Sequence, residues 1–374
     1  MASLDKPRHA KYWQRCFTSY LPSAYTTNDS TRLTFAFFIV SALDLLSVPF
    51  TSKERSSIRS WVLSLQHPDG GFCGSPTHVM SGQDATKGSA NLATTFFALL
   101  LLGVAAGTDD EARAAFAGVQ RRKLLRFLHD IRHELGANCE ETYDGGAAEL
   151  SQHESHGEAG YAYCAIAALY MLDRPASSTA PHKSEAVDKG VPDRDALIHF
   201  LVHRQFNYLV EQEQDESDEG DANYVQAKLG DLSLSHHCAH VGYNGRWNKK
   251  ADTCYCWWVA GTLAMVDSFH AVNIPPSRQY LLDVTQHRIG GFSKHAGGPP
   301  DLYHSYLGLA ALALMGDTDL KEFDVGLCCI QSLEIIPTTS PDMSDSAPPA
   351  SEKDPWNIKS KEKFETYAAH ADTT

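Results

Sequence analysis

The stretch from Gly242 to Trp258 holds a group of residues whose types and spacing suit chemistry. It reads G-Y-N-G-R-W-N-K-K-A-D-T-C-Y-C-W-W, so three cationic residues precede Asp252 and Cys254, and an apolar segment follows. Asp252, in an N-cap position, would leave Cys254 in the first turn of a helix. A cationic loop that leads into a helix suits an anion, because unpaired backbone N–H groups and the helix dipole add to the side-chain charge.

A carboxylate and a thiol at one helix start supply two ligands of an open zinc site, which needs a third protein ligand and keeps a fourth position for substrate. His304 is the candidate, in D-L-Y-H at the start of another apolar segment. The spacing alone leaves an alternative open, in which Asp252 only caps a helix, Cys254 is a core thiol and His304 is a satisfied polar residue. D-x-C with a distant histidine is a weak metal pattern by itself.

The elements that must position these residues repeat along the chain. Glycine turns stand at 69–72, 144–146, 242–245 and 290–292. Each precedes a helix of small, aromatic and aliphatic residues, predicted at 91–102, 159–172, 252–263 and 301–315. These helices are apolar nearly all round, so we expect them to be buried on both sides.

More polar partners are predicted to form an outer layer. They lie at 54–65, 110–133, 193–211, 276–287 and 318–334, and two further helices are predicted within 8–48. Strand signals are nearly absent. We therefore predict an all-α fold, an α/α barrel (toroid) of inner and outer helices that spans residues 1–336.

Two segments fall outside the repeats. Residues 173–232 form an acidic low-complexity insert around the helix at 193–211, and residues 337–374 have a similar Ser-, Pro- and Asp-rich composition. We predict that the non-helical parts of the insert are solvated and that 337–374 is a disordered tail. Neither segment is given a catalytic role.

The net charge and the composition of the chain exclude several classes of function. The net charge of −14 argues against a nucleic-acid-binding protein, which needs a basic face. No run of 18 apolar residues predicts a membrane span, and the first residues lack the apolar core of a signal peptide. Nine irregularly spaced cysteines favour reduced thiols, so we predict a cytoplasmic protein.

Three segments resemble the β subunits of protein prenyltransferases, in particular those of the type I geranylgeranyl enzymes. They are R-W-N-K-K-A-D-T-C-Y-C-W-W, G-G-F-S-K-H-A-G-G-P-P-D-L-Y-H-S-Y-L-G and D-S-T-R-L-T-F-A-F-F-I-V-S-A-L-D-L-L. With the glycine repeats they cover most of residues 8–335. The resemblance implies one zinc ion per β subunit, held by Asp252, Cys254 and His304, with the sulfur of the substrate cysteine as fourth ligand and nucleophile.

The resemblance also implies the reaction and the partners. A C20 geranylgeranyl group would pass from geranylgeranyl diphosphate to the cysteine of C-terminal CaaX proteins, with X often leucine, such as Rho-type small GTPases. The family works as an obligate heterodimer with a helical-repeat α subunit.

Four residues match family positions near the diphosphate of the donor. Arg246, Lys249 and Tyr255 match those that hold it, and cations and a phenol aimed at the leaving group stabilise the transition state. Lys294 stands where the farnesyl enzymes have an aspartate that helps to bind Mg²⁺. The resemblance therefore implies that Lys294 neutralises the diphosphate and that Mg²⁺ is not required.

Other residues bear on the isoprenoid. Thr34 falls where the farnesyl enzymes have a tryptophan, so it leaves room for a fourth isoprene unit, and Trp258 matches an isoprenoid-contact tryptophan. Phe96, Tyr161, Trp257 and Tyr306 would suit the same hydrophobic funnel, although most aromatics on such helices belong to the core.

The chain departs from the family pattern in two places. The family has E-x-H-G-G-x-T-F-C, whose histidine contacts the diphosphate, whereas this chain has E-S-H-G-E-A-G-Y-A-Y-C. Either two residues are inserted after His156 or Glu158 takes the place of the histidine. We favour the insertion, because a carboxylate would repel diphosphate. A further inner-helix unit of the family has no match between 103 and 158.

Two other functions remain as alternatives. A farnesyltransferase β subunit is opposed by Thr34 and Lys294. A non-catalytic helical-repeat scaffold would follow from a shortened barrel, but a structural zinc site would want four protein ligands and the sequence shows three.

Overall fold

The computed structural model describes residues 3–80, 90–106, 115–135, 139–141, 146–149, 157–174, 183–209 and 239–330. The chain divides into two compact units, Met1–Ile336 and Pro337–Thr374. Every described residue belongs to the first unit, so the predicted tail lies outside the described residues.

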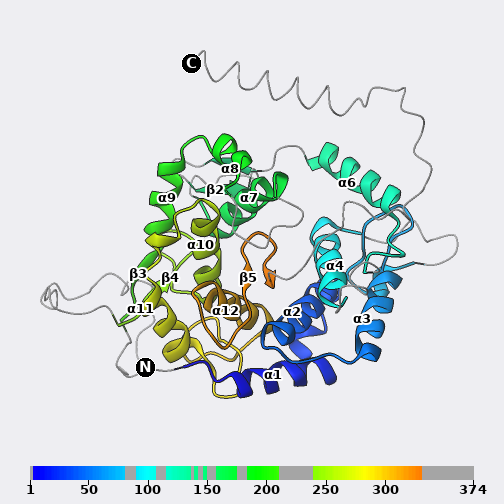
Figure 1. Cartoon of the computed structure of the whole chain (residues 1–374), viewed down its shortest axis with the longest axis horizontal. Coiled ribbons are helices and arrows are strands. Elements are labelled where there is room, and N and C mark those ends of the chain that lie inside the picture. The colour runs from blue at the N-terminus through cyan, green and yellow to red at the C-terminus, as the bar shows by residue number, and fades with distance from the viewer. Residues whose placement is uncertain are drawn as a thin grey trace, which may run out of the picture. The chain divides into compact units, whose positions relative to one another are not determined.

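The first unit is mainly helical (Figure 1). Its α-helices are α1 Lys6–Thr18, α2 Arg32–Leu45, α3 Ser52–Ser64, α4 Leu92–Val104, α6 Arg121–Leu135, α7 Ala159–Leu172, α8 Glu185–Gly190, α9 Arg194–Val202, α10 Thr253–Met265, α11 Ile274–Gln279 and α12 Leu302–Leu314. A π-helical turn, Tyr280–Thr285, continues α11. Among the described residues, no helix combines the length and the apolar character needed to cross a membrane.

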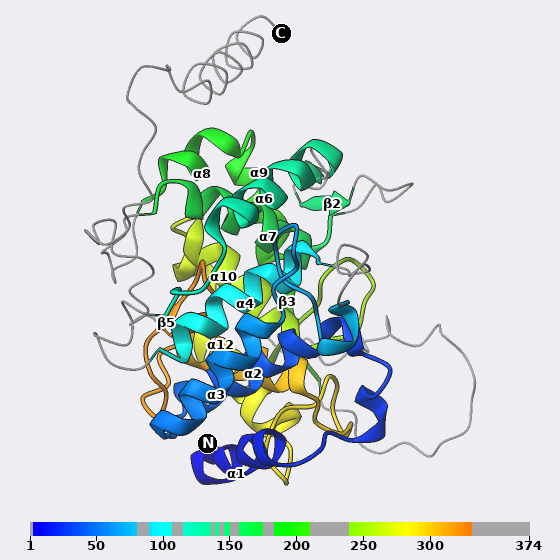
Figure 2. The same ribbon diagram turned by 90° about the vertical axis from the view of Figure 1, so that its right-hand side faces the viewer.

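The inner helices form a row in the order α4, α2, α12, α10, α7, in which each packs against the next. Outer helices cover them: α1 packs on α2, α3 on α4, α8 on α7 and α9 on α10. Figure 2 shows α2 and α4 side by side with α3 outside them. The predicted inner and outer layers of an α/α toroid are therefore confirmed.

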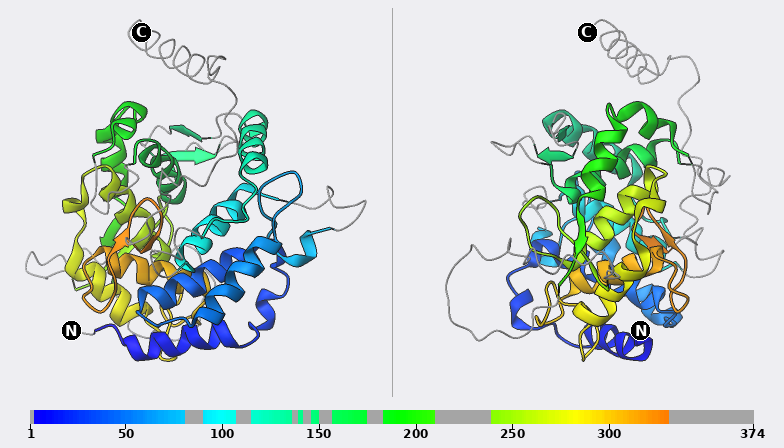
Figure 3. Two further views of the ribbon diagram at one scale, coloured as in Figure 1. Left: turned by 45° about the vertical axis from the view of Figure 1, so that its right-hand side comes forward. Right: turned by 90° about the vertical axis from the view of Figure 1, so that its left-hand side faces the viewer.

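No inner helix among the described residues connects α4 to α7. Between these helices the described residues supply α6 and a hairpin, but no further inner helix (Figure 3). Phe96 of α4 and Tyr161 of α7 are 40% and 37% exposed, whereas Trp257 and Tyr306 are fully buried in the core. Of the two alternatives left open for these aromatics, burial therefore favours the core for Trp257 and Tyr306.

Strands form three small antiparallel hairpins. They pair β1 Cys139–Glu141 with β2 Ala147–Glu149, β3 Gln205–Asn207 with β4 Val241–Tyr243, and β5 Phe323–Asp324 with β6 Cys329–Ile330. They are too short to change the all-α class.

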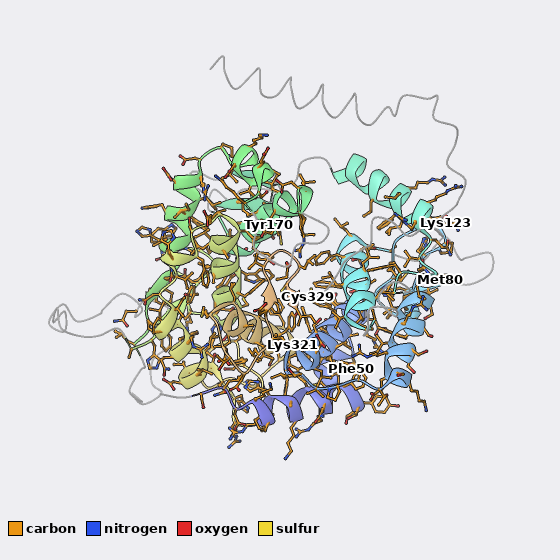
Figure 4. The ribbon with its side chains drawn as sticks, in the orientation of Figure 1. Phe50, Met80, Lys123, Tyr170, Lys321 and Cys329 are labelled. Atoms are coloured by element: carbon orange, nitrogen blue, oxygen red, sulfur yellow. The ribbon has the colours of Figure 1, made fainter. Side chains whose placement is uncertain are left out.

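The β5–β6 hairpin replaces the outer helix predicted at 318–334, so that prediction is wrong. The Asp324 carboxylate accepts the backbone N–H groups of Gly326 and Leu327, at 3.0 and 2.9 Å, and Cys328 has a φ of 53°. A side chain that bonds its own following backbone favours a turn over a helix. The hairpin lies against α2 and α12, and Figure 4 shows Cys329 toward the middle of the view.

Part of the acidic insert is folded. Residues 183–209 contain α8 and α9, and Val187, Leu197 and Phe200 are buried. The sequence predicted a non-helical, solvated segment before residue 193. That prediction is wrong around Val187, which is buried on the short helix α8. Residues 175–182 and 210–238 lie outside the described residues.

The glycine turn before α12 anchors the N-terminal helix. Gly290 and Gly291 have φ values of 90° and 78°, and a Cβ on Gly290 would lie 2.6 Å from the carbonyl oxygen of Arg8. His9 completes the contact: its Nδ1 accepts the Gly291 N–H at 3.2 Å and its Nε2 lies 3.0 Å from Oε1 of Gln286. Only a neutral imidazole satisfies both contacts, because Nδ1 must accept a proton.

Burial lowers the pKa of His9 to about 4, even though the Gln286 hydrogen bond raises it. Between about pH 6.5 and 4 the unfolded chain holds a proton on His9 that the folded chain does not, so stability falls as pH falls. We expect acidification from pH 7.5 to 5.5 to remove about 1 kcal/mol through this residue. Urea unfolding of wild type and His9→Gln at both pH values measures it. Equal losses in the two proteins would contradict the prediction.

Candidate metal and anion site

Two inner helices begin side by side, and each begins with an aspartate. Asp252 caps α10, where its Oδ1 accepts the Cys254 N–H at 3.0 Å. Asp301 caps α12, where its Oδ1 accepts the His304 N–H at 2.9 Å. Both carboxylates satisfy backbone donors that a helix start leaves unpaired. The caps therefore fix Cys254 and His304 in the first turn of their helices.

The structure brings together all three predicted metal ligands. One ligand atom each of Asp252, Cys254 and His304 lies within 4.8 Å of the others, and all three residues are buried. Nε2 of His304 lies 3.1 Å from Oδ1 of Asp252. A carboxylate, a thiol and an imidazole that converge in this way fit Zn²⁺ with one position left for a substrate atom.

The three candidate ligands shift one another's pKa values. Burial raises the pKa of Asp252, but the contacts with His304 and Cys254 outweigh it and bring the pKa down to about 2. Burial lowers the pKa of His304, yet Asp252 and Asp301 raise it to about 9. Burial and the Asp252 charge raise the pKa of the Cys254 thiol well above its usual value. A metal ion here would therefore replace protons on His304 and Cys254.

Asp301 has a second role beside capping. Its Oδ2 lies 2.6 Å from Nδ1 of His304, so it holds the ring with Nε2 toward Asp252. A carboxylate on the far nitrogen of a metal-binding histidine fixes the ring orientation and raises its basicity. Sequence reasoning missed this role, although D-x-x-H at a helix start places the aspartate at the cap and the histidine three residues on.

We expect Asp301→Asn to weaken zinc binding about 10- to 100-fold, because outer carboxylates of metal-bound histidines contribute at that level. Asparagine caps a helix as well as aspartate does, so α12 should remain stable. Competition with a chromophoric chelator measures the affinity, and the unfolding temperature is the control. Wild-type zinc affinity in the variant would show that Asp301 only caps α12.

One of the predicted cationic residues, Lys294, contacts the ligand cluster. Nζ of Lys294 lies 3.6 Å from Oδ2 of Asp252, with the side chain 55% exposed. Arg246 is half-buried and Lys249 is exposed, both on the loop between β4 and α10. His156 lies outside the described residues, so its role stays a prediction.

Glu158 and Tyr255 meet where α7 and α10 begin. Glu158 caps α7, with Oε2 accepting the N–H groups of Gly160 and Tyr161 at 2.8 and 3.0 Å. A Cβ on Gly245 would lie 2.3 Å from Cζ of Tyr255 and 2.5 Å from Oε1 of Glu158, so the three residues are in direct contact. Burial, followed by the Glu158 carboxylate, raises the pKa of the Tyr255 phenol.

An aromatic wall connects α10, α12 and α2. Nε1 of Trp258, which is half-buried, donates to Oη of Tyr303 at 3.0 Å. The Tyr303 ring centre lies 6.2 Å from that of Phe38. Thr34 is half-buried one turn before Phe38, so the two lie on one face of α2. Trp258 and Thr34 thus belong to neighbouring parts of one apolar surface.

A family model described as the prenyltransferase alpha-alpha toroid domain matches residues 4–140 and 137–329. The chain belongs to this prenyltransferase family. The match covers the described helices and the three candidate metal ligands, so it confirms the resemblance seen in the sequence.

Individual proteins similar to this chain agree with the family assignment. It is 26% identical to a geranylgeranyl transferase type-1 subunit beta of Arabidopsis thaliana, over 86% of this chain and 87% of the relative. It is 25% identical to the Dictyostelium discoideum protein of that name, over 83% and 90%. A protein farnesyltransferase subunit beta of Schizosaccharomyces pombe is 24% identical, over 83% and 79%.

A solved structure is similar as well. The Candida albicans protein geranylgeranyltransferase-I complexed with GGPP superposes with a TM-score of 0.65 at 23% identity, over 89% of this chain and 97% of that chain. At this identity the likeness shows the fold. This chain therefore has the expected α/α toroid fold.

Proposed function

We propose that this chain is the β subunit of a protein geranylgeranyltransferase type I, which moves a C20 geranylgeranyl group from geranylgeranyl diphosphate to the cysteine of C-terminal CaaX proteins. The observation that carries the proposal is the buried convergence of Asp252, Cys254 and His304 beside Lys294. The names and the coverage of the two geranylgeranyl transferase relatives support it.

Asp252, Cys254 and His304 would hold one zinc ion. Bound there, zinc would lower the pKa of the substrate thiol and so supply a thiolate at neutral pH. Asp301 would keep Nε2 of His304 directed to the ion. Burial of the three ligands limits the access of competing water to the site.

Four side chains would hold the diphosphate end of the donor. Arg246, Lys249 and Lys294 supply positive charge where negative charge grows as the C–O bond breaks, and Tyr255 supplies a phenol. Because the Lys294 ammonium already lies next to the metal cluster, we propose that turnover needs no Mg²⁺. His156 would add a further contact to the diphosphate.

The remaining parts of the proposal concern the isoprenoid and the partners. Thr34 leaves space for the fourth isoprene unit, and Trp258 lines the chain path. The chain would work in the cytoplasm as an obligate heterodimer with an α subunit and act on proteins such as Rho-type small GTPases. A farnesyltransferase β subunit is the second candidate, since one relative carries that name.

The test is transfer by this chain co-expressed with a matching α subunit. C15 and C20 donors are supplied with a CaaL peptide, in a Mg²⁺-free buffer whose EDTA is too dilute to remove zinc. One zinc per heterodimer and preferential C20 transfer would support the zinc ligands, Thr34 and Lys294 together. Preference for C15 would favour the farnesyl alternative. If the heterodimer bound no zinc and transferred neither donor, the result would favour a non-catalytic helical-repeat scaffold.

A further inference from the structure

Glu158 differs from the other residues that cap the inner helices. Asn91, Asp252 and Asp301 cap α4, α10 and α12 with short side chains. Glutamate is not a favoured N-cap residue, yet Glu158 caps α7 through Oε2 alone. Its longer side chain leaves a second carboxylate oxygen that the cap does not use.

That second oxygen is buried at the proposed anion site. Oε1 of Glu158 has no regular hydrogen bond among the described residues. The ring of Tyr255 is beside it: a Cβ on Gly245 would lie 2.3 Å from Cζ of Tyr255 and 2.5 Å from Oε1 of Glu158. The backbone of Gly245 packs against both, and its carbonyl accepts the Ala159 N–H at 3.0 Å. A buried carboxylate oxygen needs a donor, and the phenol hydroxyl is the adjacent one.

We infer that Glu158 is a positioning residue for Tyr255: Oε1 accepts a hydrogen bond from the phenol hydroxyl and turns that hydroxyl toward α7, away from an anion at the cationic loop. The inference rests on the proposed function in that it takes this anion to be the donor's diphosphate. To accept a hydrogen bond from Tyr255, an incoming diphosphate must break the Tyr255–Glu158 contact. It must also bind near the Glu158 carboxylate, whose negative charge repels it. Glu158 therefore weakens the binding of diphosphate and eases its release after transfer.

The test is the binding of inorganic diphosphate to the zinc-loaded heterodimer, measured by calorimetry in Mg²⁺-free buffer. In Glu158→Gln the amide oxygen still caps α7, while the amide N–H donates to the phenol oxygen and frees the phenol proton. We expect binding to tighten about tenfold, because one repulsive charge is lost and one donor is gained. In a Tyr255→Phe background, the same change should tighten binding only about twofold, through charge alone.

Glu54→Gln is the matched control. Glu54 is a half-buried carboxylate in the capping box of the outer helix α3, so this change should leave diphosphate binding unaltered. Unchanged or weaker binding in Glu158→Gln would overturn the inference, and so would an equal gain in both backgrounds. A wild-type heterodimer that binds no diphosphate would overturn the proposed function as well, whereas failure of Glu158→Gln alone leaves that function standing.

Discussion

Cys254→Ser is expected to abolish stoichiometric zinc binding and to lower kcat/KM for prenyl transfer by about three orders of magnitude or more. Serine keeps the size of the side chain but replaces a thiolate ligand with a hydroxyl that stays protonated at neutral pH. Asp252 and His304 would remain as two ligands, too few for a stable zinc site. Elemental analysis of the purified heterodimer and transfer to a CaaL peptide measure the two effects.

Cys256→Ser is the matched control for this change. Cys256 is fully buried on α10, two residues from Cys254, but it is not one of the three converging ligands. We expect this variant to retain one zinc per heterodimer even if its unfolding temperature falls, because a buried hydroxyl is costly unless it finds a backbone partner. Full zinc content and activity in Cys254→Ser would refute the ligand assignment.

Thr34→Trp is expected to lower kcat/KM for the C20 donor by about two orders of magnitude and to leave C15 transfer within a few-fold of wild type. Thr34 lies one turn before Phe38 on the apolar face of α2, next to the wall that Tyr303 and Trp258 continue. An indole there would fill the space for the fourth isoprene unit. Burial of the five carbons of that isoprene unit stabilises the bound C20 donor by about 2–4 kcal/mol. Losing this stabilisation accounts for the expected fall in kcat/KM.

Thr34→Ser is the control, because it keeps a small side chain and should keep the preference for C20. Competition between the two donors in one reaction gives the ratio of kcat/KM directly. If the tryptophan variant lost C15 and C20 transfer equally, Thr34 would be a packing position of α2 rather than a determinant of donor length.

Local sequence rules determined the pieces of the site. Asp252 and Asp301 cap their helices because short carboxylates satisfy the first backbone N–H groups, and this rule needs only neighbouring residues. Gly290 and Gly291 adopt positive φ values that other residues rarely take. The inner helices were also predictable from sequence, because a helix that is apolar on all sides must be buried on all sides.

Local rules failed where a side chain bonded the backbone in a way that the hydrophobic pattern does not show. Asp324 turns the chain between β5 and β6, where an outer helix was predicted. Val187 is buried inside a stretch whose composition predicted solvation. In both places only packing against the inner helices shows where the apolar residues belong.

Only the tertiary structure decided which helix ends meet. Cys254 and His304 are far apart in the sequence, and the packing of α10 against α12 brings them within reach of one ligand. The same packing places Asp301 and Asp252 on either side of His304, so a histidine that would lose its proton near pH 6.5 in the unfolded chain keeps it to about 9. The packing of α7 against α10 sets Oε1 of Glu158 against Tyr255. Contacts between separate helices depend on how the inner helices pack against one another in the folded chain, and no spacing within one segment encodes that.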